Sequence, residues 1–134
     1  MTVLALQAIQ PAIYHKLIGD GVLMGMVTGV YDVVPQNAAT PYVVIGDGTA
    51  QELPQVVNQL TEITLDLHVW TKGGGRKSVL SILNRIYGLL HQGTISPSGF
   101  TLISMHCSDA QTNVDALHDR VEGVLRVVIM VMEA

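Results

Sequence analysis

The sequence predicts an α+β fold, a two-layer sandwich in which a mainly antiparallel sheet of about five strands carries two helices on one face. The first observation is the alternation of apolar and polar residues over 61–70, which is the period of a strand with one buried face. The second is the spacing of apolar residues over 79–90, three and four apart, which is the period of an amphipathic helix. The third is that most of the other predicted strands are joined by polar loops, which favours antiparallel pairing.

Taking the chain in order, residues 3–18 carry apolar side chains at helical spacing, and we expect Asp20-Gly21 to end that helix. Pro11 removes a backbone donor and clashes with the preceding turn. The helix therefore either begins near Gln10 or kinks there. Residues 22–29 are apolar but rich in glycine, and the pattern fits a short helix and a packed loop equally well.

Two short strands are predicted next, over 29–34 and over 42–45, with a polar loop between them. Gly46-Asp47-Gly48 is expected to end the second strand. A long loop should then lead from residue 48 to residue 60, and a loop of that length is either mobile or ordered by a partner.

After the central strand and its helix, residues 100–107 are predicted to form a strand, and the polar stretch 108–119 a projecting hairpin loop. Residues 121–132 close the sheet as a long strand. One face of that strand is fully apolar. The other, with Arg126, Val128 and Met130, is only half apolar, so we expect something to cover part of it.

The composition indicates a single domain over 1–134 with more apolar surface than a monomer needs. Hydrophobic residues make up 49% and charged residues only 13%, against about a quarter charged in typical soluble domains. The single cysteine, Cys107, excludes an intramolecular disulfide and fits a reducing compartment. The net charge of -4 argues against sequence-independent binding of nucleic acid. Since no stretch resembles a signal peptide or a membrane span, we expect a soluble, cytoplasmic chain with no membrane contact.

The stretch GGGRKS at 73–78 invites comparison with phosphate-binding loops. A Walker loop would need glycine in place of Thr71 and Arg76, and a dinucleotide-binding fingerprint would need glycine in place of Ser78. We therefore interpret the glycines as a turn between strand and helix. Lys72, Arg76 and Lys77 are expected to meet solvent or an acidic partner surface.

Asp66 and His68 stand two residues apart on one strand face, a spacing that can present two metal ligands. His106 supplies a third ligand only if its strand pairs in the right register. The simpler interpretation is a polar strand face, and we predict no metal, cofactor or catalytic residue. His106 and Cys107 point to opposite faces, so they cannot act as base and nucleophile, and Cys107 is expected to be a small core residue.

Trp70, the only tryptophan, lies on the polar face of the central strand. Covered by Val128 and Met130 it would be ordinary packing, whereas uncovered it would anchor a subunit contact, which is the interpretation we favour. The candidate interface residues come from this face, the basic edge and the two predicted loops: Trp70, Lys72, Arg76, Lys77, Gln51, Glu52, Gln55, Asp109, Gln111, Asn113 and Asp115.

Three blocks carry a family resemblance: GVYDVVPQNAATPYVVIGD at 29–47, ITLDLHVWTKGGGRKSVLSILNRIYGLLH at 63–91 and RVEGVLRVVIMV at 120–131. In this order and spacing they resemble the tail-completion proteins, or tail terminators, of long-tailed bacteriophages (siphoviruses) and gene transfer agents. The resemblance covers about residues 3–132.

The resemblance implies a non-enzymatic structural protein of the virion neck, assembled in the host cytoplasm. It would form a hexameric ring that caps the completed tail tube, stops tube polymerisation and docks to the head–tail connector. DNA would pass through the ring without specific binding. One alternative is a head-side adaptor ring contacting the portal. An alternative of another class is a small metal-dependent or ligand-binding enzyme that uses Asp66, His68 and His106.

Overall fold

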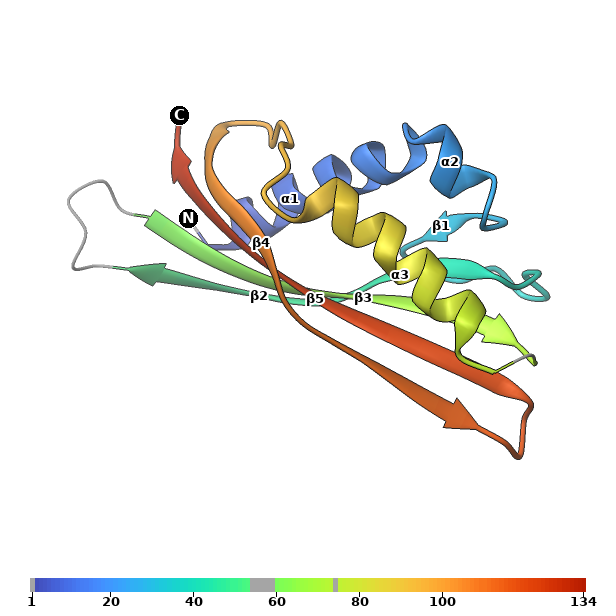
Figure 1. The fold of residues 1–134 in the computed structure, drawn as a ribbon. Coiled ribbons are helices and arrows are strands. Elements are labelled where there is room, and N and C mark those ends of the chain that lie inside the picture. Colours follow the sequence, from blue (N-terminus) through green and yellow to red (C-terminus); the bar gives the residue numbers. More distant parts are fainter. Residues whose placement is uncertain (1, 54–59, 74) are drawn as a thin grey trace.

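The computed structural model describes residues 2–53, 60–73 and 75–134, which form one sheet with the helices on a single face (Figure 1). The sheet order is β1-β2-β3-β5-β4, and every neighbouring pair is antiparallel except β1 and β2. The predicted α+β sandwich is confirmed. No helix in the described ranges is long and apolar enough to cross a membrane. The elements are α1 (Thr2–Ile18), α2 (Gly21–Met24), β1 (Val30–Tyr31), β2 (Tyr42–Leu53), β3 (Leu60–Lys72), α3 (Lys77–Leu90), β4 (Phe100–Asp115) and β5 (Arg120–Glu133).

β3 is an inner strand of the sheet, paired with β2 on one side and β5 on the other. The alternation read from the sequence is confirmed, because Ile63, Leu65, Leu67 and Val69 are all buried beneath the helices. α3 contributes the matching layer with Val79, Ile82, Leu83, Ile86 and Leu90. Between the two elements, Gly73 and Gly75 both have positive φ, so the glycines form a turn.

α1 runs without a break through Pro11, so of the two alternatives left open at this proline, a helix start near Gln10 is excluded. The ring of Pro11 is exposed, while Ile9, Ile13 and Leu17 are fully buried. A proline inside a helix costs about 3 kcal/mol, whereas each buried aliphatic side chain stabilises by about 1.5–3 kcal/mol. Packing against β2 and β3 therefore outweighs the lost hydrogen bond.

The predictions around β1 and β2 need two corrections. β1 is only two residues long, and it pairs parallel with β2. β2 does not end at Gly46-Asp47-Gly48 but continues to Leu53. Its pairing with β3 shifts register at a β-bulge between Ile45 and Gly48 and then resumes. The predicted loop is thus wrong for residues 48–53, and residues 54–59 lie outside the described ranges.

The predicted hairpin loop at 108–119 is also wrong, because β4 extends to Asp115 and only residues 116–119 form the turn. In this half of the strand the side chains on the helix side are Ala110, Thr112 and Val114, since they pair with Leu125, Gly123 and Val121 of β5. β4 is the edge strand, and these three positions are exposed or partly exposed, so they need not be strongly apolar. The strand consequently has no apolar period that the sequence could reveal.

Asp20 does not end α1, because Gly19 already closes that helix by donating its N–H to the His15 carbonyl at 3.0 Å. Asp20 instead caps α2 by accepting from the Leu23 N–H at 2.9 Å. Its carboxylate also binds Arg85 of α3 through two hydrogen bonds of 2.8 and 2.6 Å. The Arg85 hydrogen bonds, and then the Leu23 N–H, lower the pKa of Asp20 to about 2. This ion pair therefore links the start of α2 to α3 within the helical layer.

Acidification is expected to weaken the fold through Asp20. Its pKa is lower in the folded chain (about 2) than the ordinary value of 3.8, so the stabilisation is complete above the ordinary value and is lost as the pH falls through about 2. The measurement is the melting temperature at about pH 5 and about pH 2.5, compared with Asp20→Asn, which keeps a side-chain oxygen for the cap but has no charge to lose. The wild-type chain should lose more than the variant, and an equal loss in both would contradict this role.

Candidate functional site

The described helices all lie on one face of the sheet (Figure 1), and we call the opposite face the open face. It carries every second residue of β3 from Glu62 to Lys72, with the residues that pair with them in β2, β5 and β4. Trp70 lies on it, as predicted, and so does Lys72 of the basic edge. Gln51 lies on it in β2, whereas Glu52 pairs with buried Thr61 and stands on the helix side. The structure also brings four residues of the wrongly predicted loop to this face, as alternate positions of β4: Asp109, Gln111, Asn113 and Asp115.

Three other candidate interface residues are not part of the open face as the structure describes it. Arg76 and Lys77 lie at the start of α3, both exposed. Gln55 falls outside the described residues. The candidate residues, predicted from a strand face, a basic edge and two loops, therefore lie mainly on one sheet face with the basic edge beside it.

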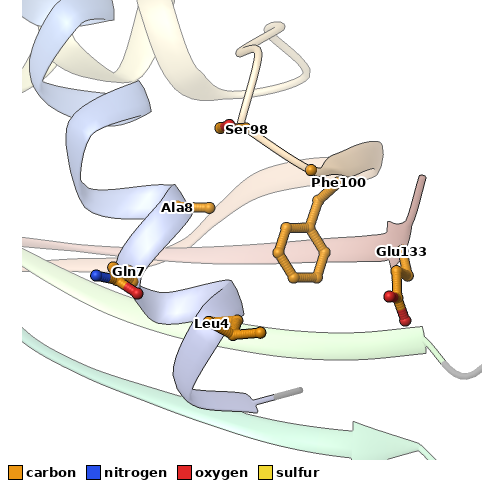
Figure 2. A pocket seen from close by; sticks show the side chains of 7 residues that line it. Leu4, Gln7, Ala8, Ser98, Phe100 and Glu133 are labelled. Atoms are coloured by element: carbon orange, nitrogen blue, oxygen red, sulfur yellow. The ribbon is translucent and has the colours of Figure 1, made fainter.

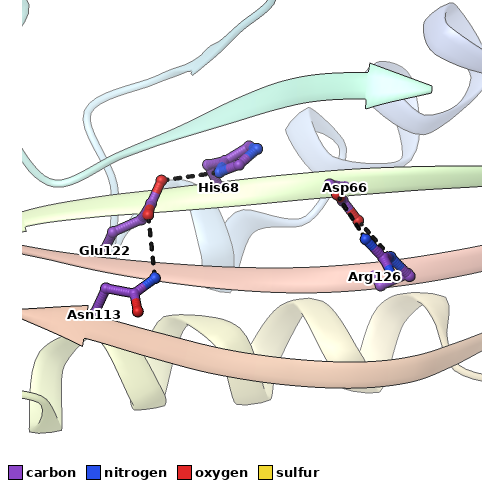
Figure 3. A network of polar contacts seen from close by, with 5 residues as sticks. All are labelled: Asp66, His68, Asn113, Glu122 and Arg126. Carbon is purple, nitrogen blue, oxygen red and sulfur yellow. Dashed lines mark hydrogen bonds and ion pairs between the residues drawn. The ribbon is translucent and has the colours of Figure 1, made fainter.

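A polar network crosses the open face between β3, β5 and β4 (Figure 3). Arg126 donates from Nε and one terminal nitrogen to the two oxygens of Asp66, at 3.0 and 3.3 Å. His68 Nδ1 lies 3.0 Å from Oε2 of Glu122, whose other oxygen accepts from Asn113 at 3.4 Å. The hydrogen bond to Asp66 and the charges of Asp66 and Asp109 raise the pKa of Arg126. These groups therefore satisfy one another across the sheet.

This network accounts for two of the three residues considered as metal ligands. Asp66 is bound to Arg126 and His68 to Glu122. His106 lies in the row of Val128 and Thr64, away from both. In the part of the chain that the structure describes, no group of three or more His, Cys, Asp or Glu side chains is placed to hold a metal ion. The register thus separates the three residues that the enzyme alternative needed.

Sequence reasoning missed Glu122 and Arg120 as members of this surface. Both alternate with buried residues of β5, and both lie opposite open-face residues of β3, namely Trp70 and Lys72. The signal was present in the alternation of the last strand, but only the register shows which residues meet.

Trp70 is half-buried, and the guanidinium of Arg120 lies over its ring, 4.6 Å from the ring centre. This geometry is a cation–π contact. The alternative interpretation, in which Val128 and Met130 cover the Trp70 ring, is wrong. These two residues pair with Thr64 and Glu62 further along β3. Trp70 therefore keeps a partly exposed ring beside a charged side chain.

Cys107 and His91 form a separate contact at the end of α3, where the Cys107 backbone N–H donates to Nδ1 of His91 at 3.1 Å. Burial raises the pKa of the Cys107 thiol to about 11. The thiol packs against the core, as predicted, and a protonated thiol is a poor nucleophile. This contact is structural in character.

An apolar hollow of about 420 Å³ lies between the start of α1 and the start of β4 (Figure 2). Leu4 and Ala8 of α1 face Phe100 across it, with the carboxylate of Glu133 at one side. It opens on the helical layer, at the end of the sheet away from Trp70.

A second hollow of about 420 Å³ lies at the opposite end of the sheet, between the loop 34–40 and the β4–β5 turn. Lys72, His118 and Arg120 line it together with Tyr42. The turn is fixed beside β3 because the Gly73 N–H donates to the Asp119 carbonyl at 2.9 Å. Basic side chains from two strands thus gather at one end of the open face.

Comparison with known proteins assigns the family. Residues 11–132 match the sequence profile of the family described as tail completion protein gp17. The chain is 30% identical over 124 residues to the tail completion protein gp17 of Bacillus phage SPP1, covering 92% of both chains.

Two solved structures share the fold. One is a chain of the virion of a native gene transfer agent particle, with a TM-score of 0.87, 22% identity and coverage of 96% of this chain and 97% of that one. The other is bacteriophage SPP1 gp17, with a TM-score of 0.65, 28% identity and coverage of 94% and 90%. Because the profile spans nearly the whole chain and the SPP1 relative is 30% identical over 92% of both chains, this protein belongs to the tail completion protein gp17 family.

Proposed function

We propose that this protein is a structural component of a phage or gene-transfer-agent virion that forms a ring, with six subunits, on the end of the completed tail tube. The ring stops further polymerisation of the tube and offers its other side to the head–tail connector. The observation that carries the proposal is membership of the tail completion family across residues 11–132. The role is non-enzymatic, and DNA passes through the ring without specific binding.

The architecture supports a subunit that is completed by its neighbours. β4 is an edge strand of 16 residues, and β1 pairs with only Val43 and Val44 of β2 at the other edge. Long open edges expose unpaired backbone groups, which proteins usually cover. The open face between these edges carries Trp70 and Arg120, two residue types enriched in interface hot spots. Contacts along the edges and this face would bury surface that the single chain leaves exposed.

The decisive experiment is electron microscopy of particles made without this protein. A tail terminator predicts overlong or ragged tails that do not join heads, because tube polymerisation then has no stop. An adaptor ring on the head side instead predicts tails of normal length beside heads that have lost their DNA. Tails of normal length joined to full heads would contradict both roles.

A further inference from the structure

A third hollow, of about 450 Å³, lies on the open face where β2, β3 and β5 meet the loop that follows β1. Carboxylates of Asp32, Asp47 and Glu122 line it, together with His68 and Trp70. Among the residues that the structure describes, no lysine or arginine lines it. We call it the acidic hollow.

Two of the three carboxylates in the acidic hollow have no partner. Glu122 is bound to His68 at 3.0 Å (Figure 3). Asp32 and Asp47 are both exposed, and neither makes an ion pair or a hydrogen bond with a described residue. The guanidinium that lies over the tryptophan ring does not line the hollow. The negative charge of Asp32 and Asp47 is therefore available to a cation from outside the chain.

The β-bulge of β2 shapes one wall of the acidic hollow. It leaves Gly46 and Asp47 without pairing partners in β3, and a bulge commonly redirects a side chain out of the regular alternation. A Cβ atom on Gly46 would lie 2.6 Å from two atoms of the His68 ring, so the absence of a side chain there leaves room for the imidazole. Both residues of the bulge thus contribute to the hollow.

A lysine or arginine side chain fits this hollow. The carboxylates attract its charged head, and Val34 and Val44, which also line the hollow, suit its aliphatic stem. The Trp70 ring adds an aromatic surface on which a guanidinium can stack. A phosphate backbone would be repelled by the same carboxylates. No group of described residues is placed to hold a metal ion.

The chain itself carries two cations of this kind without partners. Arg76 and Lys77 stand at the start of α3, both exposed, and neither makes an ion pair with a described residue. α3 lies on the helix side of the sheet, whereas the acidic hollow opens on the other face (Figure 1). The two cations of one chain are therefore separated from its own hollow by the sheet, and a second copy can supply them instead.

A contact between the acidic hollow of one copy and the start of α3 of the next joins two different surfaces. Such a heterologous contact leaves each copy with one hollow and one pair of cations for its two neighbours, so the contact repeats, and it gives a ring if the rotation closes. It is also continuous with Trp70, the residue of the open face expected at a subunit contact. A second copy thus explains both unpartnered groups at once, which an unrelated basic protein does not.

We propose that the acidic hollow binds the start of α3 of a second copy of this chain, with Arg76 and Lys77 of that copy meeting Asp32 and Asp47 beside Trp70. The proposal rests on the proposed function, because it specifies the contact between neighbouring subunits of the ring.

The direct test uses two charge-reversed variants. Arg76→Glu with Lys77→Glu keeps the acidic hollow and reverses the cations, whereas Asp32→Lys with Asp47→Lys keeps the cations and reverses the hollow. Each variant alone should self-associate about tenfold more weakly than the wild type, because like charges then meet. An equal mixture of the two should regain the association of the wild type, because each hollow then meets the opposite charge.

The association is measured by NMR, with the ¹⁵N-labelled chain titrated by the same unlabelled chain or by the other variant. In the wild type the amide signals of residues 32–47 and 75–78 should shift as the protein concentration rises, and added salt should weaken the shifts. Lys16→Glu, a charge reversal on α1, is the control and should associate as the wild type does.

Four results would overturn the proposal. They are variants that each associate as the wild type does, a mixture that associates no better than its components, wild-type shifts that map to other residues, and a wild-type chain without concentration-dependent shifts. Recovery in the mixture requires both variants to be folded, so misfolding cannot imitate the expected result. If a variant were misfolded, the mapping and the salt dependence of the wild-type shifts would still decide the matter.

A complementation experiment separates this proposal from the proposed function. Supplied to phage lacking the wild-type gene, either charge-reversed variant alone should reduce the yield of infectious particles at least tenfold relative to Lys16→Glu, and the two together should restore it. Full yield with each variant alone would overturn this contact while leaving the ring as a proposal. Normal joined tails in the absence of the protein would instead overturn the proposed function.

Discussion

Replacing Gly123 by valine is expected to lower the free energy of unfolding by about 3 kcal/mol, the upper part of the usual range for overpacking a core. Gly123 lies in β5 directly beneath α3. A Cβ atom there would lie 2.6 Å from Cγ1 of Val79 and 2.7 Å from Cδ1 of Leu83. Val79 is β-branched and has almost no rotamer freedom in a helix, so it cannot turn aside. The helix must lift from the sheet, although valine is the better residue for a strand.

Gly88→Ala is the matched control, because Gly88 lies in α3 with nothing within 4 Å of its missing Cβ. Alanine there should raise the free energy of unfolding by about 0.5–1 kcal/mol through helix propensity alone. Urea unfolding measures both, with the m-value as the check that the two-state transition is unchanged. A Gly123→Val chain as stable as the wild type would mean that α3 does not pack on β5 at this point.

The contact at Gly123 explains which parts of the fold the sequence predicts. β3 and α3 pack face to face, so the buried positions of each element carry large aliphatic residues at the period of that element. Because that pattern lies within each element, it can be recognised in the sequence. The same burial lets α1 keep its helical spacing through Pro11, but the sequence does not show how much burial compensates for the proline.

The second half of β4 shows where such prediction fails. Ala110, Thr112 and Val114 face the helix side but lie on the edge strand, where they are exposed or partly exposed, so burial does not select large apolar residues there. β2 fails for another reason, since Gly46-Asp47-Gly48 resembles a turn yet forms a bulge held in register by β3. In both cases pairing with a distant strand decides the structure, and no local signal records it.

The candidate site likewise has residues that a local pattern reveals and residues that only strand pairing brings together. The sequence placed Trp70 on the polar face of one strand through its alternation and named Lys72 as part of a basic edge, and both lie on the open face. It grouped Asp109, Gln111, Asn113 and Asp115 as a loop, and the structure brings them to that same face through pairing with β5. The partnership of Trp70 with Arg120 depends on register between residues 50 positions apart, so composition and spacing could not reveal it.

If this protein forms a ring on tail tubes as proposed, replacing Trp70 by alanine is expected to reduce ring formation about 30-fold, because an interface hot spot is worth about 2 kcal/mol and each 1.4 kcal/mol is a factor of ten. Trp70 is not part of the buried core, so the variant should still fold. The measurement is co-sedimentation of purified protein with tail tubes over a range of protein concentrations, with circular dichroism as the check of folding.

Tyr87→Ala is the control that places the contact on one side of the molecule. Tyr87 is an exposed aromatic residue of α3, in the helical layer, where it stacks on His91. If the open face carries the subunit contact, Tyr87→Ala assembles as the wild type does and only Trp70→Ala fails. The reverse result would move the contact to the helical layer. Trp70 and its Arg120 partner would then be needed only to cover the sheet, and the network of Asp66, Arg126, His68 and Glu122 would be a solvated surface.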